Sequence, residues 1–255
     1  IFAKNNDPMN RICLSIVWML TGFTSSCGSS EATDARSKVY FIREITPENL
    51  VRIYDALERP ATGRVAVKLS TGEPGGHHFL QPALIAQLVQ KVNGTIVECN
   101  TAYGGGRAAT ADHLKAAEAH GFTAIASVDI MDADGEVALP VKNGKHLKED
   151  IVGAHYLDYD FTMVLSHFKG HMMGGFGGAL KNISIGIASS QGKAWIHSAG
   201  KTTDIAKVWG DLPPQDDFLE SMAEAAEAII DHCGDKILYI SVANNLSVDC
   251  DCDSN

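Results

Sequence analysis

The sequence has no excess of basic residues: its 255 residues carry a formal net charge of −10. A chain of this charge offers no cationic face to a phosphate backbone, which excludes recognition of DNA or RNA. It also has no apolar run of the roughly 18–20 residues that a transmembrane helix needs. Its six cysteines are irregularly spaced and do not form a disulfide scaffold. With 45% apolar residues, the chain is instead typical of one large globular domain.

The N-terminal residues predict an export signal. Met9 is the first methionine, Arg11 supplies a positive charge, and a short apolar stretch follows over residues 12–23. Three small residues at 24–26 then lead into Cys27. This order is that of a signal peptide, and a cysteine in this place resembles a bacterial lipobox, in which the cysteine becomes lipidated. The alternative is a buried N-terminal helix in which Cys27 is incidental.

The signal divides the chain into two regions. Residues 1–36 would hold upstream residues, a lipoprotein-type signal and a tether, and residues 37–255 a single α/β domain that continues beyond Asn255. The mature protein would then be exported and lipid-anchored at the bacterial cell envelope, with membrane contact only through that anchor. If residues 9–27 are not a signal, we expect a cytoplasmic protein.

Extended and helical patterns alternate along the rest of the sequence. Strand, helix and strand in repetition predict a parallel sheet covered on both faces. We therefore expect a three-layer α/β fold with a mostly parallel sheet, helices on both faces and a small insertion near 130–155. Thr46 is a candidate N-cap and Gly121 a candidate C-cap. The expected strands are 38–43, 65–69, 95–99, 124–128, 136–141, 161–166 and 236–242, and the expected helices are 47–57, 82–92, 110–120 and 217–232.

Four of the expected strands end in loops that are rich in glycine and in functional side chains. These loops cover residues 70–78, 100–107, 167–182 and 244–253. In open α/β sheets, ligands bind beyond the carboxyl ends of the strands. We therefore expect the four loops to converge on a single cleft.

The longest of these loops is a candidate site for a small anionic ligand. Its glycines could present backbone N–H groups to a phosphate or carboxylate at a helix N-terminus, and two lysines add positive charge. The alternative is that the small residues serve only tight strand-to-helix packing. The expected ligand-binding residues are Gly174, Gly175, Gly177, Gly178 and Asn182, and the expected catalytic residues are Lys169, His171 and Lys181.

Histidines and cysteines near the strand ends are candidate metal ligands. His167 and His171 are four residues apart and would share one face of a helix, although the nearby glycines favour a loop. Cys250 and Cys252 would point to the same side of an extended segment. Thiolates suit zinc, copper or iron–sulfur clusters, and Cys99 could supply a third position. The alternatives are hydrogen-bonded histidines and thiols that are free or disulfide-linked.

Three carboxylates, Glu73, Glu98 and Asp129, end or follow strands in the expected cleft. They would act as acid–base groups, or they would hold the loop lysines and Arg107 in place. No Ser-His-Asp order or nucleophile elbow accompanies them.

Five segments in these loops resemble a bacterial and archaeal family, the domain of unknown function 362. They read KLSTGEPGG at 68–76, ECNTAYGG at 98–105, SHFKGH at 166–171, GGFGGALKN at 174–182 and DCDCD at 249–253. The resemblance covers residues 37–255 and is strongest to a group described as uncharacterised iron–sulfur centre proteins. It implies four-iron four-sulfur clusters held by ferredoxin-type cysteine repeats, yet the sequence has no C-x-x-C-x-x-C run. It implies no activity for any named residue.

Three hypotheses follow for the function. The first is a metal- or iron–sulfur-binding protein with a redox role, which uses Cys250 and Cys252 with His167 or His171 and carries either a cluster or a single divalent metal. The second is an enzyme without a cluster that holds a small anionic substrate on the loop 174–181. The third is a lipid-anchored binding protein of the cell envelope with the same cleft and no chemistry. The sequence names no redox partner.

Overall fold

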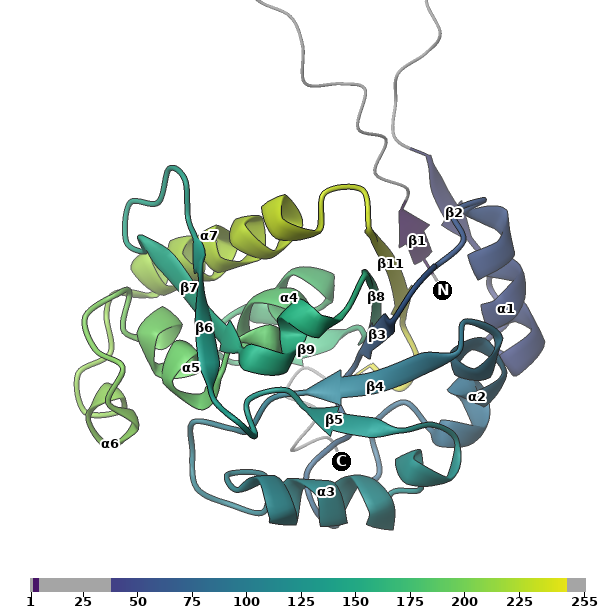
Figure 1. The fold of residues 1–255 in the computed structure, drawn as a ribbon, viewed down its shortest axis with the longest axis horizontal. Coiled ribbons are helices and arrows are strands. Elements are labelled where there is room, and N and C mark those ends of the chain that lie inside the picture. Colours follow the sequence, from purple (N-terminus) through teal and green to yellow (C-terminus); the bar gives the residue numbers. More distant parts are fainter. Residues whose placement is uncertain (1, 5–37, 247–255) are drawn as a thin grey trace, which may run out of the picture.

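The computed structural model describes residues 2–4 and 38–246, and the side chains of 38–246. A seven-stranded sheet lies at its centre (Figure 1). The order is β2 (Val39–Phe41), β1 (Phe2–Lys4), β11 (Ile237–Val242), β8 (Phe161–His167), β3 (Val65–Lys68), β4 (Gly94–Glu98) and β5 (Val128–Ile130). From β11 to β5 the neighbouring strands are parallel, whereas β1 and β2 pair in antiparallel fashion at one edge.

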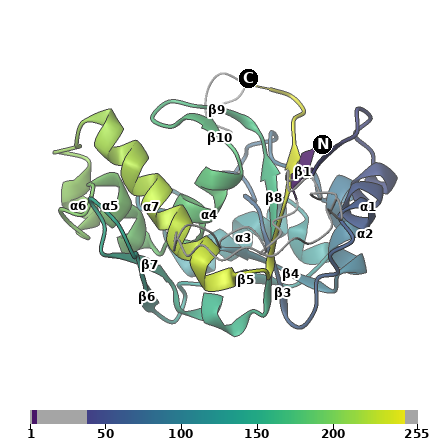
Figure 2. The ribbon, with the colours of Figure 1, turned by 90° about the horizontal axis from the view of Figure 1, so that it is seen from above.

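Helices cover both faces of this sheet. Figure 2 shows two groups of helices on opposite sides of β8 and β11. The first group contains α1 (Pro47–Ala56) and α2 (Pro82–Lys91), with α3 (Thr110–Ala119) beside β5, and the second contains α4 (Ala179–Ile187), α5 (Ser190–His197) and α7 (Gln215–Cys233). A short helix, α6 (Ile205–Val208), follows α5. The α/β fold with a mostly parallel sheet and helices around it is therefore confirmed.

The two faces of the strands build two separate hydrophobic cores. Val67 and Leu165 belong to the core under α1 and α2. Ala66 and Val164 belong to the core under α4 and α7. Because successive side chains of a strand point to opposite faces, Lys68 at the end of β3 faces the α4 side, which places an ammonium group beneath this helix.

The long, strongly patterned elements lie within one or two residues of their expected bounds. Helix α1 begins after Thr46, whose hydroxyl accepts a hydrogen bond from Asn49 N at 3.2 Å. Helix α3 ends before Gly121, which takes the left-handed φ of +86° that glycine adopts without strain. Both expected caps are confirmed.

The expected strand at 124–128 is wrong in position. Gly121 leads into a 3₁₀ turn, Phe122–Ala124, whose Phe122 side chain is fully buried, and β5 begins only at Val128. The apolar residue Phe122 thus anchors a turn, and the strand starts only at Val128.

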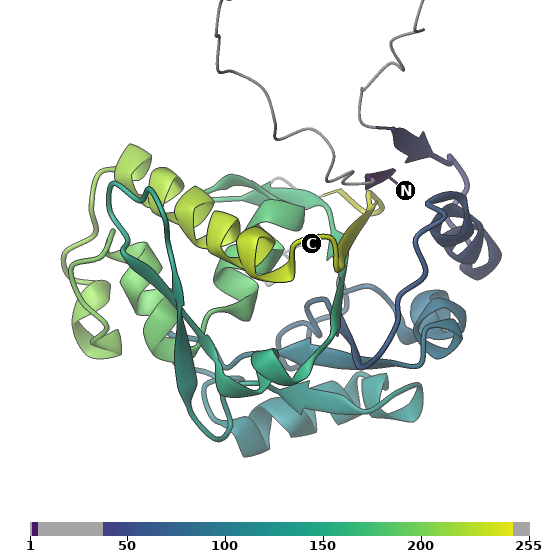
Figure 3. The same cartoon turned by 45° about the horizontal axis from the view of Figure 1, so that its top comes forward.

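Two short hairpins complete the fold. The insertion contains β6 (Glu136–Pro140) and β7 (Glu149–Gly153), an antiparallel pair that packs on α5 and α7 (Figure 3). A second pair, β9 (Lys169–His171) and β10 (Gly175–Gly177), lies between β8 and α4. The sequence pattern does not predict β7, β9, β10, α5 or α6 and gives no bounds for α4, because elements this short carry too few residues for a periodic signal.

Residues 2–4 were expected to lie upstream of the domain, yet they form β1 between β11 and β2. An exposed sheet edge offers unpaired backbone groups that an extended segment can satisfy. The proposed signal from Met9 to Cys27 lies outside the described residues. Within residues 38–246, no helix is long and apolar enough to cross a membrane.

Candidate functional site

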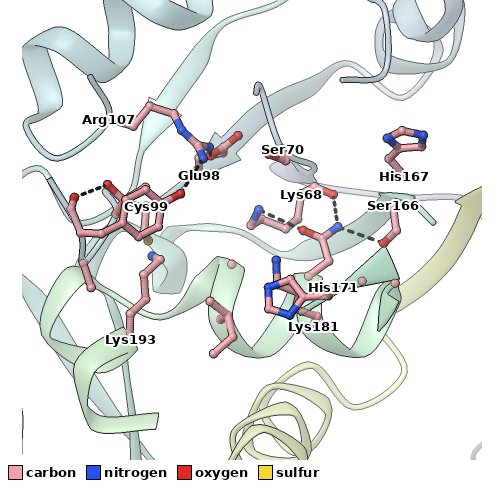
Figure 4. A pocket seen from close by; sticks show the side chains of 18 of the residues that line it. Lys68, Ser70, Glu98, Cys99, Arg107, Ser166, His167, His171, Lys181 and Lys193 are labelled. Atoms are coloured by element: carbon pink, nitrogen blue, oxygen red, sulfur yellow. Dashed lines mark hydrogen bonds and ion pairs between the residues drawn. The ribbon is translucent and has the colours of Figure 1, made fainter. Parts of the chain in front are cut away.

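A pocket of about 210 Å³ lies where the parallel strands end (Figure 4). The loops after β3, β4 and β8 line it together with α4 and α5, so the structure brings three of the four expected loops together. The fourth loop reaches its wall, since the Asn244 carbonyl accepts a hydrogen bond from His167 Nε2 at 2.7 Å. The polar side chains that line the pocket are Lys68, Ser70, Glu98, Thr101, Tyr103, Arg107, Ser166, His167, Lys169, His171, Lys181, Asn182, Lys193 and His197.

Lys68 is a buried amine inside this pocket. Its Nζ donates to Asn182 Oδ1 at 3.0 Å and to the Leu69 carbonyl at 2.5 Å. A Cβ atom at Gly186 on α4 would lie only 2.7 Å from Lys68 Cε, so the glycine leaves the space that the amine needs. Burial lowers the pKa of Lys68 to about 8, an effect that the neighbouring Glu98 only partly offsets.

Asn182 ties α4 to two strands. Its side-chain amide donates to the Lys68 carbonyl at 3.1 Å and to Ser166 Oγ at 3.0 Å, while its Oδ1 accepts from the Lys68 amine. Figure 4 shows this network around Lys68 and Ser166. Asn182, expected to bind a ligand, lines the pocket and also holds Lys68 in place.

Glu98 is the centre of a buried ion-pair network. Arg107 Nη1 lies 3.2 Å from Glu98 Oε2, and His113 Nε2 lies at the same distance from that oxygen. The backbone N–H of Thr71 donates to the other carboxylate oxygen, and Arg107 also pairs with Glu73. Burial alone would raise the pKa of Glu98, but the His113 hydrogen bond and the Arg107 charge hold it well below its usual range. Glu73 and Glu98 are expected either to act as acid–base groups or to hold cationic side chains in place. The structure shows the second role, because both carboxylates pair with Arg107.

Asp129, the third of these carboxylates, lies away from the pocket lining. His155 Nδ1 is 2.9 Å from its Oδ1, and the Tyr159 hydroxyl donates to its Oδ2 at 2.8 Å. This cluster fixes the segment that follows β7, at the end of the insertion, to β5.

Three further lysines line the pocket. Lys169 on β9 is 5% exposed, and Lys181 lies in the first turn of α4. Lys193 on α5 is 7% exposed, and its Nζ donates to the Ala188 carbonyl at 2.5 Å. Burial lowers the pKa of Lys193, which shows how little solvent reaches this ammonium group.

The pocket therefore concentrates positive charge in an acidic protein. Among the residues that the structure describes, its lining holds one carboxylate, Glu98, which is paired with Arg107, and five cationic side chains. The whole chain has a net charge of −10, so this local excess is opposite in sign to that of the molecule. The five cations are Lys68, Arg107, Lys169, Lys181 and Lys193.

Two histidines in the lining are neutral at pH 7. Burial, followed by the charges of Lys181 and Lys169, lowers the pKa of His171 to about 4. Burial likewise lowers the pKa of His197 to about 4. The Gly174 N–H donates to His171 Nδ1 at 2.9 Å, so the neutral ring carries its proton on Nε2. His171 can thus donate one hydrogen bond to a ligand.

The expected anion loop is a hairpin followed by a helix. Gly177 and Gly178 line the pocket, and Gly178 caps α4 with no side-chain hydrogen bond to the helix. Gly174 and Gly175 stand at the turn of the β9–β10 hairpin and are not part of the lining. Only the second half of the glycine run is placed where it could contact a ligand.

The described residues do not fit an iron–sulfur cluster. The Cys99 thiol donates to the Ile187 carbonyl at 3.2 Å, and burial raises its pKa to about 12, so it is not a thiolate. Cys233 lies against Tyr156 and Thr162, away from the pocket. Cys250 and Cys252 lie outside the described residues.

The two expected histidine ligands both line the pocket, but from different strands. His167 ends β8 and His171 ends β9, so the four-residue spacing does not place them on one helical face. Within residues 38–246, the group of three side chains spaced as metal ligands lies elsewhere: His146 with Asp217 and Glu220, where loop and α7 meet.

Sequence reasoning missed several pocket residues, among them Lys68, Lys193, His197 and Trp209. Lys68 reads as the end of an apolar strand, and its charge stands out only within the family motif. Lys193 and His197 lie on α5, an unpredicted helix, and share one face because they are four residues apart. The helix N-cap Ser189, whose hydroxyl accepts from Gly192 N, was the available signal for α5.

The fold and site define a parallel α/β protein with a cationic pocket at the carboxyl ends of its strands. The profile of the domain of unknown function 362 (DUF362) matches residues 65–255, and the chain belongs to this family. The match identifies the family as a whole, and membership of its group of iron–sulfur centre proteins stays a prediction.

Two solved structures are similar to the chain. The lactate racemase apoprotein from Thermoanaerobacterium thermosaccharolyticum is 14% identical with a TM-score of 0.44, over 82% of this chain and 54% of that one. A protein from Thermotoga maritima is 13% identical with a TM-score of 0.48, over 80% of this chain and 53% of that one. The chain thus spans about half the length of these structures. No curated protein matches it.

Proposed function

We propose that the pocket binds a small organic anion, a carboxylate or phosphate, and that the chain is an enzyme acting on it. The carrying observation is the convergence of five cationic side chains on one space at the carboxyl ends of the strands. An anion held in this space would accept charge-assisted hydrogen bonds from several of them, and such bonds are about twice as strong as neutral ones.

Lys68 is the residue suited to proton transfer. A pKa of about 8 leaves roughly a tenth of the amine neutral at pH 7, so both forms are present near neutral pH. The amine could then remove a proton from a bound substrate and return it. Lys169 and Lys181 would hold the anionic group, and the Nε2–H of His171 would donate a hydrogen bond to it.

Thermal unfolding of the full chain with inorganic phosphate and with acetate tests the anion site. A ligand at about 100 times its Kd stabilises a protein by about 2.7 kcal/mol, which raises the Tm of a chain this long by roughly 5–10 °C. Lys181→Ala should weaken anion binding and reduce this shift. The control Lys148→Ala removes an exposed lysine outside the pocket and should keep it.

Chloride at matched ionic strength separates binding from screening. A Tm shift that chloride reproduces, or one that Lys181→Ala retains, would contradict the proposed anion site.

A second candidate function is metal binding with a redox role. The observation that favours it is the contact between His167 Nε2 and the Asn244 carbonyl, six residues before Cys250. Six residues can span up to roughly 20 Å, so Cys250 and Cys252 are within chain reach of the pocket wall.

Elemental analysis of the full chain, purified without oxygen, tests this candidate. Iron with acid-labile sulfide, lost in Cys250→Ser/Cys252→Ser, would support a cluster. Stoichiometric zinc that is lost in the same variant would support a single divalent metal. A metal-free folded protein would exclude both and leave the anion site.

A further inference from the structure

A second, shallow depression of about 310 Å³ adjoins the cationic pocket. The two share Ala102, Tyr103 and Trp209, and Gly104 and Ile205 complete the wall of the depression. None of these five residues carries a charge. A strongly cationic space thus continues directly into an uncharged, partly aromatic one.

The two aromatic rings at this boundary are fixed by their polar ends. Trp209 Nε1 donates to the Ala102 carbonyl at 3.0 Å, and the Tyr103 hydroxyl donates to Glu73 Oε1 at 2.6 Å. The side chains nevertheless remain 40% and 43% exposed. Because their hydrogen-bonding groups are satisfied within the protein, the surface that remains is ring surface suited to apolar contact.

The size of the cationic pocket shows why a ligand would use both spaces. At about 210 Å³ it is smaller than the roughly 300–1,000 Å³ typical of ligand sites. An organic anion whose charged group lies among the lysines therefore extends outward. The indole of Trp209 also contacts the ring of His197 in the pocket lining, with centroids 5.2 Å apart, so the aromatic wall runs from one space into the other.

We propose that the ligand has two parts, an anionic group held in the lysine-lined pocket and a flat apolar ring that packs against Trp209 and Tyr103. This inference rests on the proposed anion site and adds the class of molecule: a small aryl carboxylate or aryl phosphate. An anion without a ring would leave the aromatic wall exposed to water and would bind more weakly.

Calorimetry on the full chain with matched ligand pairs tests this. The pairs are phenyl phosphate against methyl phosphate, and 3-phenylpropionate against propionate, so that the anionic group stays constant while the ring is added. We expect the ring to tighten binding about tenfold, as for aromatic contacts in proteins. Trp209→Ala should bring the ratio within a pair close to one.

Two variants separate the parts of the site. Lys181→Ala should weaken both members of a pair and keep their ratio, because it removes charge and no ring contact. Phe41→Ala removes a ring that is 63% exposed on β2, outside both spaces, and should change neither affinity nor ratio. Trp209→Leu and Tyr103→Leu repeat the test if Trp209→Ala does not fold.

The outcomes distinguish this inference from the proposed function. Equal affinities within each pair, with methyl phosphate or propionate bound, would overturn the two-part ligand and leave the anion site standing. A ring effect that survives in Trp209→Leu and Tyr103→Leu would also overturn it. If no anion binds at physiological ionic strength, both proposals fail.

Discussion

Replacement of Lys68 by methionine should change how stability depends on pH. Methionine keeps the side chain as far as Cε and removes the ammonium group. In the folded protein burial lowers the pKa of Lys68 from 10.5 to about 8, whereas the unfolded chain retains the ordinary value. Below pH 8 both states bind the proton, but the folded state binds it less tightly. Each pKa unit corresponds to 1.36 kcal/mol, so the folded state is destabilised there by about 3 kcal/mol.

This destabilisation decreases as the pH rises from about 8 to 10.5, because only the unfolded state still binds the proton in that interval. Urea unfolding of the wild type and of Lys68→Met at pH 7 and at pH 11 measures it. The free energy of unfolding of the variant minus that of the wild type should fall by about 3 kcal/mol between the two pH values. Titrating groups that do not interact with Lys68 contribute equally to both proteins and cancel.

The exposed Lys148→Met serves as the control and should show no such change. A difference between Lys68→Met and the wild type that stays constant from pH 7 to pH 11 would refute the reasoning. It would mean that Lys68 titrates in the folded protein as it does in the unfolded chain.

Three further substitutions test other parts of the structure by urea unfolding. Glu98→Gln removes one of the two carboxylates that pair with the buried Arg107 and should cost roughly 1.5–3 kcal/mol; an unchanged midpoint would contradict the network. Gly186→Ala should destabilise the wild type, because its Cβ would lie 2.7 Å from Lys68 Cε. In a Lys68→Ala background the same substitution should stabilise the protein by about 1 kcal/mol. Equal effects in the two backgrounds would contradict the close approach of Gly186 and Lys68. Burial raises the pKa of Asp150 to about 8. As the pH rises from 4 to 8, the free energy of unfolding of the wild type should therefore fall relative to that of Asp150→Asn. Free energies of unfolding that change in parallel for the two proteins would contradict this pKa.

The order of the main elements could be predicted because each carries a local signal. Val65–Lys68 is buried on both faces and therefore reads as a continuous apolar run, while α1 has both a cap and an apolar face. The short elements have no such signal. Residues 169–177 form a hairpin because their backbone groups pair with each other, and glycine-rich sequence gives no apolar alternation that would reveal this.

The location of the site could be predicted better than its composition. Parallel strands place their following loops at one edge of a sheet, so the convergence of the loops followed from the order of elements alone. Which side chains enter the pocket depends on the face of the strand that each residue occupies and on how the helices pack against the sheet. Lys68 faces α4 through its position in β3, and Lys193 enters from a helix that joins the pocket only in three dimensions. His167 and His171 do not share a helical face because the chain between them is extended, in agreement with the loop that the nearby glycines favour.

Two features near Lys68 are unfavourable for stability, and they occur together. A buried ammonium group weakens the folded state, and Gly186 in the last turn of α4 costs up to about 1 kcal/mol relative to alanine. A purely structural role would be served at least as well by an apolar side chain at one position and alanine at the other. The glycine leaves space for Lys68 Cε and for Asn182 Oδ1, which would lie 2.7 Å and 3.2 Å from a Cβ atom there, and Asn182 holds the lysine in this place. Such paired departures from local stability are expected where a side chain is kept for binding or chemistry, which is why Lys68 stands at the centre of the proposed site.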